Sequence, residues 1–258
     1  VDAKTLYYEN SAVVGANLSG LTILNEQYGL VTGDGIRRID LKSLNNVRIK
    51  NERLLCFYNS IIYNGKVLSN DTYKDESKVK YYDVNELIAA KEGEAPAVTE
   101  LDIIQKQKIN FVLAKDGNVY TLESADNGCN IVKIKNDFTL EKVFANFQPA
   151  KGPYHSSPTI GMVASETENI IYLVSTDGAI FKYILGDSDS LKAPFIAAES
   201  GVSITAPLQL NQQSGELYVT YTEERKDESK IVVYSKDGKV LHTVDCGESV
   251  PSQILFNN

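Results

Sequence analysis

The stretch that decides the fold starts at Ser157-Pro-Thr-Ile-Gly161 and continues through Ile171-Tyr-Leu-Val-Ser175 to Asp177-Gly178 and Ile180-Phe-Lys-Tyr183. A proline opens a short apolar run, a tyrosine-bearing strand follows, and an Asp-Gly pair turns the chain into the next strand. Short strands separated by turn residues, repeated at about 45–50 residues, are typical of the blades of a β-propeller.

The same pattern recurs along the chain. Proline opens further apolar runs at Pro207 and Pro251, and the first of these runs leads to Asp237-Gly238. Asp-Gly also separates strand-like runs at Asp34-Gly35 and Asp116-Gly117. Because both central residues of a type I′ turn need positive φ, Asp-Gly between alternating apolar residues predicts a β-hairpin with a two-residue loop.

These patterns predict an all-β chain that forms a single domain over residues 1–258, a β-propeller of four-stranded antiparallel blades. Five blades are expected, with six as the alternative, at about residues 11–50, 51–96, 97–150, 155–200 and 203–248. The tail 250–258 is expected to pair with N-terminal strands at 5–8 and 12–14, which would close the ring and remove an exposed sheet edge. A β-sandwich would explain the turns but not the proline-opened unit. One short helix is expected at Val84–Lys91.

The composition excludes some classes of partner. Apolar residues make up 43% of the chain and charged residues 23%, which is ordinary for a globular domain. The net charge is −8, and the basic residues are not clustered. We therefore expect no nucleic-acid partner, because neutralised phosphates supply most of that binding energy. No apolar stretch reaches the roughly 18–20 residues that span a bilayer, so no membrane span is expected. The protein is expected to be a monomer.

Motifs for catalysis and metal binding are missing from the sequence. Cys56, Cys129 and Cys246 lie far apart and form no C-x-x-C motif, although one pair could still form a disulfide. The two histidines are not paired with each other or with cysteine at zinc-binding spacing. Neither a Gly-x-Ser-x-Gly elbow nor a glycine-rich phosphate loop is present. We expect no catalytic, cofactor-binding or metal-binding residues and no cofactor.

One loop has the composition of a ligand-binding rim. Lys151, Tyr154, His155 and Ser156 combine a cation, a phenol, an imidazole and a hydroxyl just before an expected inner strand. Loops at this place in a propeller often surround the central channel, so these four residues are the candidate ligand-rim residues. The alternative interpretation is a connector between blades, shaped by Gly152-Pro153.

The opening stretch resembles a repeat of the quinoprotein-like propellers, the PQQ-like repeat, in which Ser-Pro-x-Ile, a strand and Asp-Gly-x-Leu-Tyr follow one another. The resemblance covers about residues 155–250 and is looser over 97–148. That family includes quinone-dependent dehydrogenases and non-catalytic scaffold propellers that assist outer-membrane protein assembly. Its enzymes use tryptophan to dock blades and to stack under the quinone, and this chain contains no Trp. The resemblance thus implies an extracytoplasmic location, in the periplasm or at the cell surface, while the missing tryptophan argues against quinone chemistry.

The sequence favours a non-catalytic binding or scaffold propeller, secreted or attached as a lipoprotein, that engages a protein or cell-surface partner through its loops. Two alternatives stay open. One is a glycan-processing or quinone-dependent enzyme, and a glycosidase would need two carboxylates facing each other across a cleft. The other is a sensor or structural module of a larger protein.

Overall fold

The structure, a computed structural model, describes residues 20–33, 35–50, 60–70, 77–94, 96–105, 110–150, 161–223, 228–248, 254 and 256. The chain divides into two compact units, Val1–Asp102 and Ile103–Asn258. Both units are built from small antiparallel β-sheets, and helix is limited, over the described ranges, to one short α-helix and one 3-10 turn. The prediction of an all-β chain made of small antiparallel sheets is confirmed.

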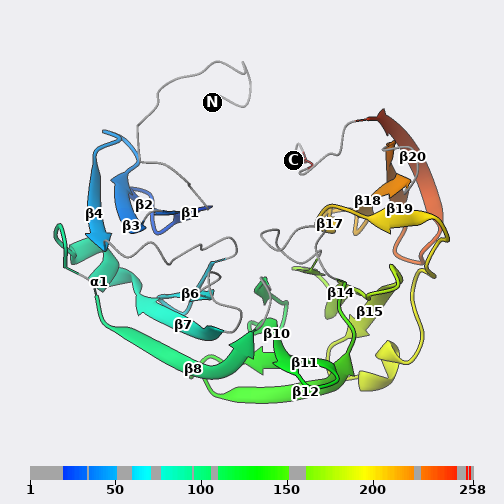
Figure 1. Cartoon of the computed structure of the whole chain (residues 1–258), viewed down its shortest axis with the longest axis horizontal. Helices are drawn as coiled ribbons and strands as arrows, with labels where there is room; N and C mark the ends of the chain where they lie inside the picture. Colours follow the sequence, from blue (N-terminus) through cyan, green and yellow to red (C-terminus); the bar gives the residue numbers. More distant parts are fainter. Residues whose placement is uncertain are drawn as a thin grey trace. The chain divides into compact units, whose positions relative to one another are not determined.

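The first unit contains two four-stranded sheets, each with its strands in chain order (Figure 1). The first sheet consists of β1 (Gly20–Ile23), β2 (Tyr28–Gly33), β3 (Gly35–Asp40) and β4 (Asn46–Lys50). The second consists of β5 (Ile61–Tyr63), β6 (Lys66–Asn70), β7 (Ser77–Asp83) and β8 (Val98–Gln105), most of which belongs to this unit. Helix α1 (Val84–Ala89) follows β7, because the Asp83 carboxylate accepts hydrogen bonds from the N–H groups of Asn85 and Glu86. The predicted short helix is confirmed over these residues.

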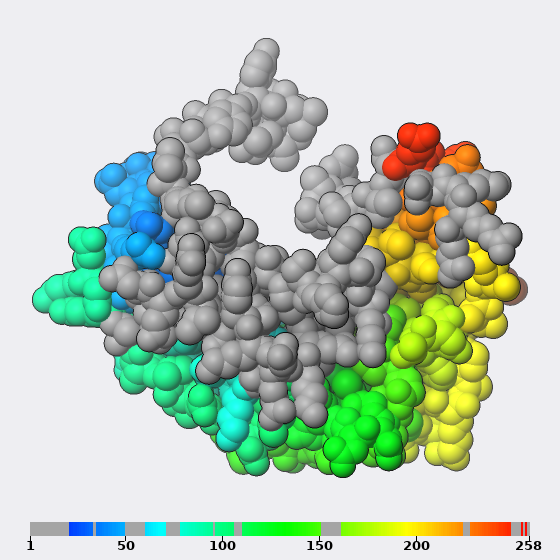
Figure 2. Space-filling view, viewed as in Figure 1, coloured from blue at the N-terminus to red at the C-terminus, as the bar shows by residue number. Residues whose placement is uncertain are grey.

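The second unit contains three sheets (Figure 1). The first consists of β9 (Val112–Leu113), β10 (Val119–Ala125), β11 (Gly128–Ile134) and β12 (Leu140–Phe147). The second consists of β13 (Met162–Ala164), β14 (Ile170–Val174) and β15 (Ile180–Ile184), and the 3-10 turn η1 (Ser188–Leu191) follows it. In the third, β16 (Val202–Ile204) and β17 (Gln209–Leu210) both pair with β18 (Leu217–Glu223), and β19 (Ser229–Tyr234) and β20 (Val240–Gly247) complete the sheet. The atoms of these sheets adjoin one another in chain order, from green through yellow to orange (Figure 2).

Successive sheets of the second unit bury their side chains against each other. One core joins Tyr120 of the first sheet to Tyr183 of the second, and another joins Tyr172 of the second sheet to Leu217 of the third. Strand β14 lies between both cores, so all its residues are buried and it reads as the continuous apolar run Ile170–Val174. A sheet of three or four strands buries little surface alone, so this face-to-face packing supplies most of the hydrophobic stabilisation.

Three of the four Asp-Gly turns, at Asp116, Asp177 and Asp237, differ from the predicted two-residue loops, and Asp34 lies outside the described residues. In the first, the N–H of Ala114 donates to the carbonyl of Asn118 at 3.0 Å, and the N–H of Gly117 donates to the carbonyl of Ala114 at 2.9 Å. The turns at Asp177 and Asp237 make the same pair of bonds. Each loop therefore has three residues, of which only the glycine has positive φ, as in a type I turn followed by a left-handed residue. The type I′ prediction is wrong for these turns, because the longer loop spares the aspartate a left-handed backbone.

These three turns also occupy different steps of their sheets. They join β9 to β10, β14 to β15 and β19 to β20, so they do not mark one equivalent point of a repeat. A second correction concerns β8, which was placed in the predicted blade at 97–150. It belongs to the sheet of β5–β7, where Lys80 of β7 forms an ion pair with Glu100 at 3.6 Å. Strand pairing, not the spacing of turns, decides which sheet this segment joins.

Ring closure stays a prediction, as do the number of blades and the single domain over 1–258. The expected N-terminal strands at 5–8 and 12–14 lie outside the described residues, as does most of the tail. Of the tail, the N–H of Ile254 donates to Gln209 Oε1 at 2.7 Å, and the rings of Phe256 and Tyr218 lie 5.0 Å apart. These tail residues thus contact the third sheet of the second unit.

Candidate ligand pocket

A bulge in β12 places two phenylalanines on one face of the strand. Cys129 of β11 pairs with Phe147, and Ile131 pairs with Phe144, so three residues of β12 oppose two of β11. In a regular strand, residues three apart point to opposite faces. The extra residue of a bulge resets this alternation. Asn146 takes up the change with a left-handed backbone, at φ 61°.

The end of β12 is held by a glycine and a glutamine. The Gln148 side chain donates a hydrogen bond from Nε2 to the carbonyl of Asn127 at 2.6 Å. It fits there because Gly128 has no side chain: a Cβ at this position would lie 2.4 Å from Gln148 Nε2 and 2.5 Å from the carbonyl oxygen of Phe147. Gly128 also has φ +118°, which favours glycine. The hairpin between β10 and β11 therefore fixes the direction in which β12 ends.

The chain after β12 then pairs with the end of β14. The N–H of Ala150 donates to the carbonyl of Val174 at 2.8 Å, and the N–H of Thr176 donates to the carbonyl of Gln148 at 2.9 Å. The Thr176 hydroxyl adds a bond to the carbonyl of Pro149 at 2.8 Å. This pairing brings the turn that contains Asp177 beside the bulged end of β12.

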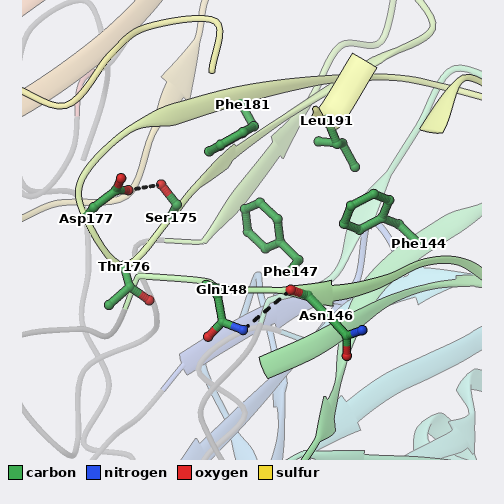
Figure 3. A pocket seen from close by; sticks show the side chains of 9 residues that line it. All are labelled: Phe144, Asn146, Phe147, Gln148, Ser175, Thr176, Asp177, Phe181 and Leu191. Carbon is green, nitrogen blue, oxygen red and sulfur yellow. Dashed lines mark hydrogen bonds between the residues drawn. The ribbon is translucent and has the colours of Figure 1, made fainter. Parts of the chain in front are cut away.

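A cavity of about 530 Å³ lies between the bulged end of β12, the Asp177 turn and η1. Its lining residues are Phe144, Asn146, Phe147, Gln148, Ser175, Thr176, Asp177, Phe181 and Leu191. Figure 3 shows the three aromatic rings and Leu191 gathered on one side and the polar side chains of the turn on the other. The rings of Phe147 and Phe181 meet edge to face at 5.7 Å. A cavity of this size and lining is typical of small-molecule sites.

The polar groups around the cavity are mostly engaged in holding the backbone. The Ser175 hydroxyl donates to the Asp177 carboxylate and also lies 2.9 Å from the carbonyl of Ala179. This hydroxyl and the N–H of Ala179 hold the pKa of Asp177 below its usual range. Asp177 is therefore ionised at neutral pH, and the pocket combines an apolar wall with one carboxylate at its edge.

Comparison with known proteins places the chain in a family. Residues 1–257 match the model of a family described as "Domain of unknown function (DUF5074)". The chain belongs to the DUF5074 family. No curated protein matches it in sequence.

Solved structures resemble this DUF5074 chain in fold. One is a catalytically inactive virginiamycin B lyase from Staphylococcus aureus with quinupristin, with a TM-score of 0.51 and 14% identity, covering 95% of this chain and 76% of that one. Another is prolyl oligopeptidase B from Galerina marginata, with a TM-score of 0.56 and 12% identity, covering 90% of this chain and 35% of that one. At sequence identities this low, the similarity concerns the fold and not the function. Both of these structures are propeller-like, which supports the propeller architecture, whereas the resemblance to quinoprotein-like propellers is not confirmed.

The structure does not test the ligand-rim residues that were singled out from the sequence. Lys151, Tyr154, His155 and Ser156 lie outside the described residues, so the ligand-rim loop stays a prediction; it begins three positions after Gln148. The sequence reasoning missed the phenylalanines of the pocket. Phe144-Ala-Asn-Phe147 carried a usable signal, because two aromatic residues three apart share a face only if a bulge intervenes, and asparagine tolerates a left-handed backbone.

The remaining candidate groups are consistent with structural roles. Cys129 is a buried free thiol whose pKa burial raises to about 11, and Cys246 is also free, while Cys56 lies outside the described residues. His242 is exposed on β20. Among the residues that the structure describes, no three His, Cys, Asp or Glu side chains are grouped to hold a metal. No helix in the same ranges is long and apolar enough to cross a membrane.

Proposed function

We propose that this protein is a non-catalytic binding domain that holds a ligand with an apolar body in the pocket formed by Phe144, Phe147 and Phe181. The observation that carries the proposal is the β12 bulge, which turns two phenylalanines of one strand toward a third on β15. Burying an aromatic or aliphatic group against these rings would supply the hydrophobic part of the binding free energy.

The hydrogen bonds of the polar side chains in the pocket favour a binding role over a catalytic one. The hydroxyl of Thr176 and the amide of Gln148 donate to main-chain carbonyls within the fold, and the hydroxyl of Ser175 donates to the Asp177 carboxylate. A group that already shapes the backbone is poorly placed to act as a nucleophile or to exchange protons with a ligand. Asp177 has a lowered pKa, which opposes the raised pKa that a general acid or base needs near neutral pH.

The experiment uses 2-(4-fluorophenyl)ethanol, a neutral aromatic probe, observed by ¹⁹F NMR with the full chain. Phe144→Ala and Phe181→Ala are each expected to weaken binding about tenfold, because each removes part of the aromatic wall. Both side chains are only partly buried, so these variants are expected to fold. The matched control is Phe195→Ala, which removes a partly buried ring that packs on Tyr172 at 5.5 Å, outside the pocket.

Two outcomes would overturn the proposal. One is the absence of probe binding to the unaltered protein at millimolar concentration. The other is equal binding by all three variants, with circular dichroism showing that each is folded.

We further propose that the protein acts outside the cytoplasm, in the periplasm or at the cell surface, with its loops facing a protein or surface partner. The support is the resemblance of residues 155–250 to propellers that are often periplasmic. Fractionation of the source cells, followed by protease treatment of intact cells, tests this. Recovery of the protein only in the cytosolic fraction would contradict it.

A further inference from the structure

Asp177 is the only charged side chain among the described residues that line the pocket. Its Oδ1 atom accepts from the Ser175 hydroxyl and from the N–H of Ala179 at 3.3 Å, which closes the turn. Its Oδ2 atom has no hydrogen-bond partner in the part of the chain that the structure describes. One carboxylate oxygen beside an apolar cavity is therefore available to a ligand.

The same turn elsewhere in the second unit shows what such an oxygen binds. At Asp116, Oδ1 again closes the turn by accepting from the N–H of Asn118 at 3.1 Å. Its Oδ2 accepts from the Tyr120 hydroxyl at 2.8 Å and lies 2.9 Å from the ammonium of Lys133. That ammonium lies 5.8 Å from the centre of the Tyr120 ring. The carboxylate and the aromatic ring together hold a cation.

The Asp177 turn repeats part of this arrangement. Phe181 stands four residues after Asp177, as Tyr120 stands four residues after Asp116, and both Phe181 and Asp177 line the pocket. What differs is the cation. The described pocket lining contains no lysine, arginine or histidine, and Phe181 has no hydroxyl to donate to the carboxylate.

From this juxtaposition we propose that the ligand is a small organic amine with an aromatic body, whose ammonium group binds Asp177 Oδ2 as Lys133 binds Asp116. The inference rests on the proposed binding function of the pocket and specifies the chemistry of its ligand. The body would contact Phe144, Phe147 and Phe181, and the ammonium would lie at the turn. A free amine is favoured over a partner's side chain because the cavity, at about 530 Å³, accommodates a whole small molecule.

The test compares three probes of similar size by ¹⁹F NMR: 2-(4-fluorophenyl)ethylamine, the neutral 2-(4-fluorophenyl)ethanol and the anion 4-fluorophenylacetate. The amine is expected to bind about fivefold more tightly than the alcohol, and the anion more weakly than both, since a partly exposed ion pair adds a modest free energy. Asp177→Asn is expected to abolish the preference for the amine, so that the amine and the alcohol bind this variant with similar affinity.

Asp237→Asn is the matched control. It changes an exposed aspartate in the same kind of turn, outside the pocket, and alters the net charge by the same amount. Retention of the amine preference in this variant, together with its loss in Asp177→Asn, would support the proposal. Equal preference in both variants would overturn it, because the overall charge of −8 would then explain the selectivity.

The remaining outcomes separate this inference from the proposed function. Equal binding of amine and alcohol, with both weakened by Phe181→Ala, would overturn the amine assignment and leave the binding pocket standing. Failure of every probe would remove both. Binding of the dipeptide amide Ac-Phe-Lys-NH₂ without binding of the free amine would also overturn the small-molecule assignment, in favour of a side chain of a partner protein.

Discussion

The hairpins β11–β12 and β19–β20 share the same loop and the same pairing at both ends, although their registers differ by one residue in between, and among the described residues the pocket adjoins only the first. Ile134 pairs with Leu140 as Tyr234 pairs with Val240, and both hairpins turn through the same three-residue loop. Near the far end, Ile131 pairs with Phe144, and the equivalent Ile231 pairs with Val244. The next equivalent pair is Phe147 and Gly247, opposite Cys129 and Ser229.

The difference shows that the bulged backbone of the hairpin does not make the pocket by itself. Val244 is 52% exposed, whereas Phe144 at the equivalent position is partly buried. Phe147, which stands where β20 has Gly247, is 5% exposed and packs on Phe181. The chain that leaves β12 pairs directly with the end of β14, and the two phenylalanines line the pocket together with Phe181. The pocket therefore depends on the side chains of Phe144 and Phe147 and on the neighbouring sheet of β13–β15, against which they lie.

The largest expected effect comes from removing the ring that distinguishes β12. Phe147→Ala should lower the free energy of unfolding by about 3–4 kcal/mol, because it empties a buried aromatic site. At the equivalent end of β20, Val244→Ala should change it by no more than about 0.5 kcal/mol, since that side chain is largely exposed. Urea unfolding followed by circular dichroism measures both. Similar losses in the two variants would mean that the hairpins are packed alike.

The second prediction concerns Gly128, which lies against the end of β12. Gly128→Ala should cost about 2–3 kcal/mol, because the new Cβ would sit against Gln148 and the Phe147 carbonyl on a backbone that disfavours side chains. It should also weaken probe binding, since it displaces the strand that carries the aromatic wall.

Gly178→Ala serves as the control for this variant. It has a left-handed φ of +86° but no atoms within 4 Å of the new Cβ, so about 1 kcal/mol is expected from backbone strain alone. Equal losses at the two positions would show that contact with Gln148 does not constrain the end of β12.

The sequence predicted the strands because their signals are local. Alternation and flanking turn residues located β14 and β15 within a residue or two of their observed ends. The membership of β8 was wrong, because the sheet that a strand joins depends on partners distant in the chain. Turn type failed for a related reason, since the number of residues in a loop depends on where pairing resumes.

The pocket was out of reach of the same reasoning. Phe144 and Phe181 are far apart in sequence and meet because the segment after β12 pairs with β14, a long-range contact with no sequence motif. Asp177 was recognised only as a turn residue, because nothing in an Asp-Gly pair tells whether a lysine will neutralise it, as at Asp116, or a cavity will adjoin it.

The smallest expected effect tests whether the β11–β12 and β19–β20 loops are equivalent. Phe138 occupies in the β11–β12 loop the position of Gly238 in the β19–β20 loop, with φ 63° against 77°. The β11–β12 loop holds a phenylalanine at this left-handed position. Gly238→Ala should therefore lower the free energy of unfolding by only about 1 kcal/mol, from the strain of the left-handed backbone. Its Cβ would lie 3.3 Å from the Phe195 ring, so the loss should slightly exceed that of Gly117→Ala, whose Cβ meets nothing within 4 Å. Thermal or urea unfolding of both variants measures this, and a loss in Gly238→Ala several times that in Gly117→Ala would show that the two loops are not equivalent.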